Sequence, residues 1–191
     1  MSTPPYFFHC AEDFYLRPLR ASDVTGRWWQ WFNDPEVTRF QAKGYYPNTP
    51  ESQAQYFASL QGSRTQVVLA IVDRATDLHL GNVGLHEIDP LHRTAVLGIV
   101  LGEAAARGRR IGTRAWEAIT DYGFLNLNLH KICATFFDGN TPSMKCALAA
   151  GYEVEGRQAA QLFKDGRYVD LHHVGLRHAR WAALRAAKGQ G

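Results

Sequence analysis

The sequence predicts one α/β domain built on a mixed, mostly antiparallel β-sheet of about seven strands. Three strand-like runs follow one another between residues 67 and 101, separated by turn-forming residues. A strand, a helix and a second strand then span residues 94–137, the pattern of a parallel crossover. Asp165-Gly166 lies between two more strand-like segments and is a strong signal for a two-residue hairpin.

The first third of the chain is expected to be mainly helical. Residues 1–12, with two prolines, are expected to form a loose arm, and residues 14–19 a short strand. A helix is predicted over residues 21–32, ended by the Asn-Asp-Pro of residues 33–35. Residues 49–60 form a second expected helix, because threonine can cap its start and proline suits its first position.

The remaining elements follow from periodicity and turn residues. Apolar residues at alternating spacings of four and three make residues 111–125 the clearest helix. The other expected ranges are 67–73, 80–88, 94–101 and 131–137 for strands, 142–150 for a helix and 177–188 for a basic helix. We therefore expect an arm at 1–12, one domain at 13–177 and a basic helical tail at 178–191.

Composition excludes several classes of protein. With 191 residues, 46% of them hydrophobic, and a net charge of +3, the chain is neither disordered nor strongly basic. No apolar run reaches the ~20 residues needed to cross a bilayer, and no signal peptide is visible. The three cysteines are too widely spaced for a disulfide framework. A cytoplasmic location and no membrane partner are expected.

The segment Arg-Gly-Arg-Arg-Ile-Gly-Thr at residues 107–113 is the best candidate for an anion site. It precedes the clearest helix, whose first amide groups lack partners and carry partial positive charge. Its glycines allow close approach of a phosphate. Arg107, Arg109, Arg110 and Arg114 place four cations there. A merely solvated helix start is the alternative, although cations at a helix N-terminus oppose the dipole.

Several segments in order resemble the GNAT superfamily of acetyltransferases. They are Leu97–Glu103, Arg107–Thr113, Asn126–Ile132, Asn140–Ser143, Ala150–Tyr152, Lys164–Asp170 and, near the N-terminus, Trp31–Val37. The resemblance covers about residues 14–177. The N-terminal segment is similar to the branch that contains ribosomal-protein N-terminal acetyltransferases and amino-sugar acetyltransferases.

The resemblance implies a sheet with helices on both faces, split into a V between its fourth and fifth strands. Acetyl-CoA would be the cosubstrate, with its pantetheine in the V and no metal. The cofactor contacts implied are Ile99, Val100, Leu101, Arg107, Gly108, Arg109, Arg110, Ile111, Gly112, Thr113, Asn140 and Ser143. Three positions depart from the family pattern: Arg110 replaces a usual loop glycine, Ala147 a common catalytic tyrosine and Val96 a glutamate of some relatives.

The expected reaction is transfer of an acetyl group to a primary amine by direct attack in a ternary complex. Ser143 would protonate the leaving thiolate. Glu87 or His86 would be the base, and since neighbouring strand residues face opposite ways, at most one points into the cleft. Glu36 would bind an ammonium or relay its proton, or else serve as a helix-start carboxylate. The acceptor would be a small molecule such as an amino sugar, or a protein N-terminus.

Two other functions remain open. The departures at Val96, Ala147 and Arg110 fit a non-catalytic acyl-CoA-binding or regulatory module. The arginine-rich loop would alternatively bind RNA, although a nucleic-acid partner is not expected from the mild net charge. A metal site is not indicated, because the adjacent His172 and His173 would point to opposite faces of a strand. A homodimer through exposed strands of the hairpin is a further possibility.

Overall fold

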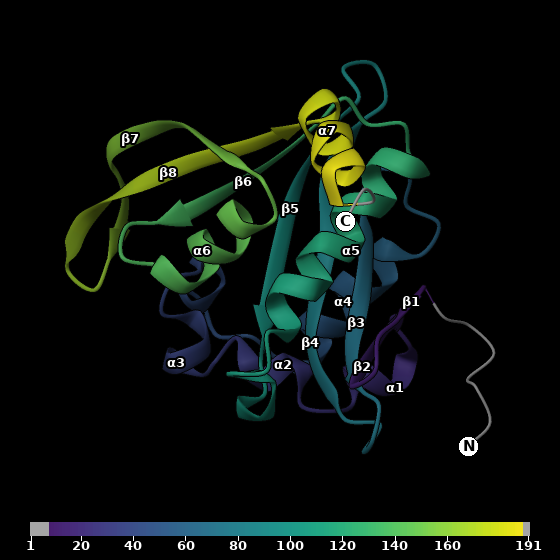
Figure 1. Cartoon of the computed structure of the whole chain (residues 1–191). Coiled ribbons are helices and arrows are strands. Elements are labelled where there is room, and N and C mark those ends of the chain that lie inside the picture. Colours follow the sequence, from purple (N-terminus) through teal and green to yellow (C-terminus); the bar gives the residue numbers. More distant parts are fainter. Residues whose placement is uncertain (1–7, 189–191) are drawn as a thin grey trace.

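The computed structural model describes residues 8–188, which form an eight-stranded sheet with helices on both faces (Figure 1). The strands are β1 (His9–Cys10), β2 (Phe14–Pro18), β3 (Val67–Asp73), β4 (His79–Asp89), β5 (Thr94–Leu101), β6 (Lys131–Phe137), β7 (Glu153–Lys164) and β8 (Arg167–Arg177). The helices are α1 (Ala21–Val24), α2 (Trp28–Trp31), α3 (Pro35–Thr38), α4 (Pro50–Leu60), α5 (Ile111–Leu125), α6 (Thr141–Ala149) and α7 (His178–Lys188), with single 3-10 turns at η1 (Ala42–Gly44) and η2 (Ala104–Ala106). Within residues 8–188, no helix is both long and apolar enough to cross a membrane.

The sheet has the order β1-β2-β3-β4-β5-β6-β8-β7, and β5–β6 is its parallel pair. This confirms the predicted mixed, mostly antiparallel sheet. The expected arm is wrong in part, because His9–Cys10 pairs with β2 and adds an eighth strand. The Phe8 amide also donates to the Leu16 carbonyl at 2.9 Å. Residues 1–7 of the expected arm lie outside the described residues.

The sheet opens between β5 and β6, as the resemblance implied for its fourth and fifth strands. These strands pair only where Thr94–Val96 meets Lys131–Cys133. Both then continue, to Leu101 and Phe137, without further pairing to each other. Figure 1 shows the two strands diverging, with α6 beside the wider end. The inner edge of β5 therefore has main-chain groups without strand partners from Leu97 onward.

The two faces of β4 and β5 have different surroundings. Because residues directly opposite in an antiparallel pair share a face, His86, Gly84 and Asn82 lie on the same face as Val96, Gly98 and Val100. Val100 packs with Trp28, Trp31 and Phe32 on this face, which we call the α2–α4 face. On the opposite face, which we call the α5 face, Leu97 and partly buried Ile99 and Leu101 join the core that includes α5.

The predicted helix over residues 21–32 is instead two short helices. The buried Asp23 carboxylate accepts from both terminal nitrogens of Arg17, at 2.7 and 2.8 Å, and so fixes α1 to β2. The chain then turns, with the Gly26 amide donating to the Asp23 carbonyl at 3.2 Å. This turn changes the helical phase so that Trp28 and Trp31 both enter the core, and Trp28 also lines the cavity described below.

The C-terminal third follows the prediction closely. Asp165 and Gly166 both have positive φ, of 50° and 80°, as a tight hairpin turn between β7 and β8 requires. The basic helix α7 is docked on the domain, because Trp181 is buried and its indole donates to Asp121 at 2.7 Å. The last three residues of the expected tail, 189–191, lie outside the described part of the chain.

Candidate active site

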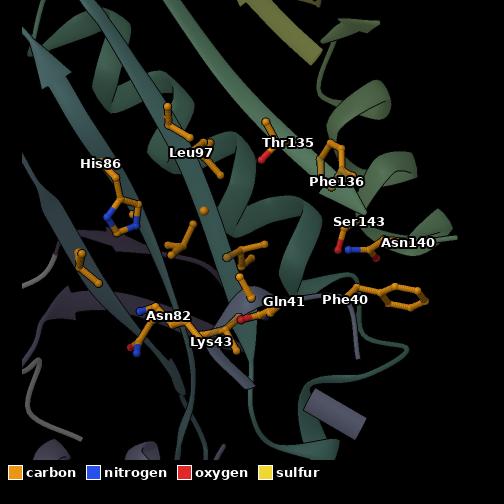
Figure 2. Close-up of a pocket in the computed structure, with 18 of the residues that line it drawn as sticks. Phe40, Gln41, Lys43, Asn82, His86, Leu97, Thr135, Phe136, Asn140 and Ser143 are labelled. Atoms are coloured by element: carbon orange, nitrogen blue, oxygen red, sulfur yellow. The ribbon is translucent and has the colours of Figure 1, made fainter. Parts of the chain in front are cut away.

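A cavity of about 340 Å³ lies where β5 and β6 diverge. Its wall comes from β3, β4, β5, β6, α2, α4, α5, the start of α6, Phe32 and residues 40–43. Figure 2 shows His86 on one side, Asn140 and Ser143 on the opposite side, and Gln41 and Lys43 below. The cavity thus brings the predicted Asn140 and Ser143 together with β5 residues 96–100, across the opening of the V.

Two glycines make the hollow on the α2–α4 face of the sheet. Gly84 and Gly98 are direct partners in the β4–β5 ladder. A Cβ on Gly84 would lie 2.6 Å from the Val67 carbonyl oxygen, so that position excludes any side chain. A Cβ on Gly98 would lie 3.4 Å from the His86 ring, which therefore leans over this glycine. The pair leaves space directly beside the imidazole.

His86 is the ionisable side chain of β4 that faces this space. Its Nδ1 lies 3.2 Å from Gln66 Oε1, which only accepts, so Nδ1 donates and Nε2 carries the lone pair. Burial lowers the pKa of His86, and the nearby Lys43 cation lowers it further. The imidazole is therefore neutral at pH 7 and able to accept a proton.

Glu87 was one of two expected bases, and the structure turns it away from the cavity. The β4–β5 register shifts between His86 and Asp89, and Glu87 takes a left-handed conformation with φ of 51° in this irregular stretch. Its side chain is exposed and does not line the cavity. Of the two adjacent candidates, His86 is the one that faces the V.

Glu36 is also exposed and does not line the cavity. It lies in the first turn of α3, and its amide donates to the capping Asp34 carboxylate at 2.9 Å. This is the position of an ordinary helix-start carboxylate, the alternative reading of this residue.

Lys43 is a cavity residue that the sequence analysis did not single out. Its ammonium lies 4.8 Å from the ring centre of Phe32 and 4.5 Å from that of Tyr56. The side chain as a whole is exposed, yet the position of its ammonium beside these rings lowers its pKa by burial. The only signal in the sequence is its place between aromatic residues in the segment from Asn33 to Tyr46.

The β7–β8 hairpin holds the segment that carries Lys43. The Tyr45 hydroxyl donates to the Phe163 carbonyl at 2.6 Å. Lys164 donates to the Thr38 carbonyl at 3.2 Å, and its ammonium lies 5.1 Å from the Tyr45 ring centre. Segments far apart in the sequence thus build one wall of the cavity.

Helix α6 contributes one hydroxyl to the cavity wall formed by residues 8–188. Ser143 lies in its first turn, next to Asn140, and both face the cavity (Figure 2). Ala147, which replaces a tyrosine of many relatives, is fully buried in the core and does not line the cavity. Ser143 is therefore the hydroxyl of this helix that faces the cavity.

The arginine-rich loop leads into α5 through a left-handed residue. Arg110, at the N-cap, has φ of 58° and ψ of 15°, and no side chain caps the helix. A left-handed N-cap explains why a glycine would suit this position. The amides of Ile111, Gly112 and Thr113 lie in the first turn of α5, where intrahelical partners do not exist. Amides without partners at a helix start are typical of an anion site, and the phosphate expected there stays a prediction.

The four arginines differ in their partners. Arg109 Nη1 donates to Asp73 Oδ2 at 2.6 Å, and Arg114 Nη2 donates to Asp13 Oδ2 at 2.8 Å. These pairs lower the pKa of both aspartates. Arg109 and Arg114 thus fasten the loop and α5 to the chain around β2 and β3. Arg107 and Arg110 are exposed.

Two further side chains of this segment are occupied within the protein. Ile111 is fully buried, and Thr113 Oγ1 donates to Cys146 Sγ at 3.1 Å. On β5, Ile99 and Leu101 face α5, while Val100 packs against the tryptophans of α2. The cofactor contacts expected at these residues, as well as at Gly108 and Gly112, stay a prediction, and the main chain is the part of these residues that would make them.

The cavity wall formed by residues 8–188 contains no carboxylate. Its ionisable side chains are His86, Lys43 and Tyr56. Within the same part of the chain, no group of three or more His, Cys, Asp or Glu residues is arranged to hold a metal ion. The expectation that no metal takes part stays a prediction.

Comparison with known proteins identifies the family. Residues 13–153 match the profile of the acetyltransferase (GNAT) domain. An uncharacterized N-acetyltransferase, p20, from Bacillus licheniformis is 30% identical over 170 residues, which is 86% of this chain and 91% of the relative. Spermidine N(1)-acetyltransferase from Escherichia coli K12 is 28% identical over 182 residues, 94% of each chain.

A solved structure shows the same fold. Spermidine N-acetyltransferase from Vibrio cholerae, crystallised with CoA and spermine, superposes with a TM-score of 0.81 over 90% of this chain and 99% of its own, at 21% identity. The chain belongs to the GNAT acetyltransferase family. It is an acetyl-CoA-dependent N-acetyltransferase, as the sequence predicted.

Proposed function

We propose that the enzyme transfers the acetyl group directly from acetyl-CoA to a neutral primary amine held in the cavity of the V, with His86 as the base. The observation that carries this proposal is that the His86 imidazole lines the same cavity as β5, whose ladder with β6 ends at Val96. The base and the main-chain groups of β5 that would bind the thioester then face the same space. Orienting two reactants in this way supplies a large part of the rate enhancement in such transfers.

Acetyl-CoA would enter along β5. The pyrophosphate would bind the amides at the start of α5, where the helix dipole favours an anion. The pantetheine would take the place of the missing strand and bond to the main chain of Ile99, Val100 and Leu101, since the β5–β6 ladder ends at Val96. Asn140 would meet the pantetheine arm or the thioester end on the opposite wall.

In the chemical step, the amine nitrogen would attack the thioester carbonyl carbon. His86 Nε2 would accept the proton that the amine gives up. A β5 amide near Val100 would stabilise the negative charge that develops on the carbonyl oxygen. As the carbon–sulfur bond breaks, the Ser143 hydroxyl would donate its proton to the departing thiolate.

The acceptor we favour is a small molecule. A cavity of about 340 Å³ lies at the lower end of the range for small-molecule sites. Amino sugars and protein N-termini, the acceptors of the branch suggested by residues 31–37, are both retained as test substrates. We also propose a cytoplasmic enzyme, because three widely spaced cysteines suit a reducing compartment.

A homodimer remains a prediction. Strand β7 forms one edge of the sheet, and most of its residues are exposed over 12 positions. Because an uncovered edge strand is a template for pairing, a second copy is expected there. Light scattering on the purified chain tests this, and a monomer mass at micromolar concentration would contradict it.

The proposed function is tested by thiol release from acetyl-CoA over a panel of primary amines. Turnover with at least one amine is expected, together with saturable acetyl-CoA binding by calorimetry. Saturable binding with no turnover on any amine, including peptide N-termini, would favour the non-catalytic module. No acetyl-CoA binding at millimolar ligand would contradict both.

A further inference from the structure

The charge inside the cavity bears on which amine the enzyme acetylates. Lys43 is the one lysine or arginine in the wall formed by residues 8–188, and no aspartate or glutamate lines that wall. A site for a polyamine needs carboxylates to offset several ammonium groups, because a charge taken out of water is costly unless it is paired. The observed wall has a lysine and no carboxylate, which is the opposite of the charge that a polyamine site needs.

The Lys43 ammonium has unused hydrogen-bond donors. Its ammonium makes no hydrogen bond or ion pair with any of residues 8–188, and the structure places it over the rings of Phe32 and Tyr56. These rings stabilise a cation through their quadrupole, but they do not satisfy three N–H donors. A partly enclosed ammonium with three open donors is a ready partner for a carboxylate or phosphate group.

Lys43 is separated from the cofactor's own phosphates by the sheet. Phe32 and Tyr56 pack with Val100 on the α2–α4 face. The helix start that would bind the pyrophosphate belongs to α5, whose core residues pack with Leu97 on the opposite face. The ligand of Lys43 is therefore the acceptor and not the cofactor.

We propose that the acceptor is a primary amine that also carries an oxyanion, either a carboxylate or a phosphate, and that Lys43 binds this oxyanion while the amine lies at His86. The proposal rests on the proposed function and specifies its substrate class. It separates this enzyme from the spermidine acetyltransferases among its relatives. A polyamine would bring ammonium groups against Lys43 with no carboxylate to offset them.

Matched substrates test the proposal and identify the oxyanion. The phosphate arm compares glucosamine 6-phosphate with glucosamine. The carboxylate arm compares β-alanine with β-alaninamide, and spermidine is the polycationic substrate. At least one anionic amine is expected to exceed its neutral partner by about 10- to 100-fold in kcat/KM, the range of a charge-assisted hydrogen bond. The favoured arm shows which oxyanion Lys43 binds.

Variants of Lys43 test whether this residue causes the preference for the anionic amine. Lys43→Met should remove it by raising KM about 10- to 100-fold for the anionic amine. The neutral partner should change by less than about threefold, and Lys43→Arg should keep most of the preference, since arginine also donates to oxyanions. Lys145→Met, on the exposed side of α6, is the matched control that removes one positive charge elsewhere. Lys43→Glu should shift the preference toward spermidine.

A readout without turnover separates this inference from the proposed function. With coenzyme A present, the anionic amine should raise the Tm of the wild type and not that of Lys43→Met. If thiol release fails while this shift appears, the proposed catalysis is wrong and the anion site stands. Three results would overturn the anion site: no Tm shift with either anionic amine, equal kcat/KM within both matched pairs, or acetylation of Lys43 itself by mass spectrometry.

Discussion

The two cationic regions of this enzyme lie on opposite faces of the same strand, and they differ in whether their charges have partners. On the α5 face, Arg109 and Arg114 are committed to Asp73 and Asp13, and the main chain is left to meet an anion. On the α2–α4 face, Lys43 has aromatic neighbours and no carboxylate. The comparison shows that arginines which are close together in a sequence can bind carboxylates of the protein itself, while the lysine of the cavity wall has none beside it.

The largest expected effect concerns the α2–α4 face. His86→Gln keeps a polar side chain but removes the base, so kcat should fall by about 10²- to 10⁴-fold. Because the pKa of His86 lies below its usual value, the neutral base persists below pH 6.5, and the acidic limb of wild-type kcat should lie under that pH. Pre-steady-state and pH-dependent thiol release measure both quantities.

Glu87→Gln is the control for this prediction, because the neighbouring carboxylate is exposed and outside the cavity. It should change kcat by less than about twofold, as a surface substitution does. A greater loss with Glu87→Gln than with His86→Gln would return the role of base to the glutamate.

The next effect concerns the hydroxyl of α6. Ser143→Ala should lower kcat by about tenfold, less than loss of the base, since a thiolate is already a good leaving group. A substrate with a better leaving thiol should recover the lost rate if the serine acts as an acid. An equal loss for good and poor leaving thiols would show that Ser143 only positions the thioester.

On the α5 face, the expected effect is on stability. Arg109→Met leaves the Asp73 carboxylate without its cation and should lower the free energy of unfolding by about 1–2 kcal/mol, because the arginine is partly exposed. Since this pair lowers the pKa of Asp73, its stabilisation is present above the unfolded-state pKa and is lost as pH falls through the lower folded-state pKa. Urea denaturation at pH 7 and in acid measures the difference.

The acetyl-CoA dissociation constant should change by less than about threefold in the same variant, since the main chain holds the anion. A tenfold weaker affinity with unchanged stability would mean that the Arg109 guanidinium binds the cofactor directly. In that case both cationic regions would bind an anion through a side chain.

The smallest expected effect is a gain in stability. Arg110→Gly relieves the left-handed N-cap and should raise the free energy of unfolding by about 1 kcal/mol. Arg110→Ala is the matched control, because it removes the guanidinium and keeps the strained backbone. Equal stability of the two variants in urea would show that the backbone carries no strain there.

Local patterns were enough to predict much of the fold. The Asp165-Gly166 turn, the periodicity of α5 and the glycine-rich start of that helix all depend on residues close in sequence. The helix over residues 21–32 was predicted as one element, because nothing local shows that Asp23 is bound by Arg17 and that the chain must turn before Trp28.

The site was harder to predict because its decisive contacts are long-range. Arg114 lies 101 residues from Asp13, its partner, so sequence proximity wrongly assigned it to a cationic cluster. Glu87 and His86 were correctly treated as alternatives, but which one faces the cavity depended on an irregularity in the β4–β5 ladder. The proposed role of Lys43 in binding an oxyanion depends on the tertiary structure, which places aromatic rings from the end of α2 and from α4 beside its ammonium.

The short β5–β6 ladder has a consequence for the lifetime of the empty enzyme. The unpaired inner side of β5 is an edge within the sheet, and exposed edges promote association between chains. A pantetheine bonded along β5 would cover that edge. Binding at 100 times the dissociation constant adds about 2.7 kcal/mol to the folded state. We therefore expect the cellular level of coenzyme A to protect this chain from aggregation as well as to supply its acetyl groups.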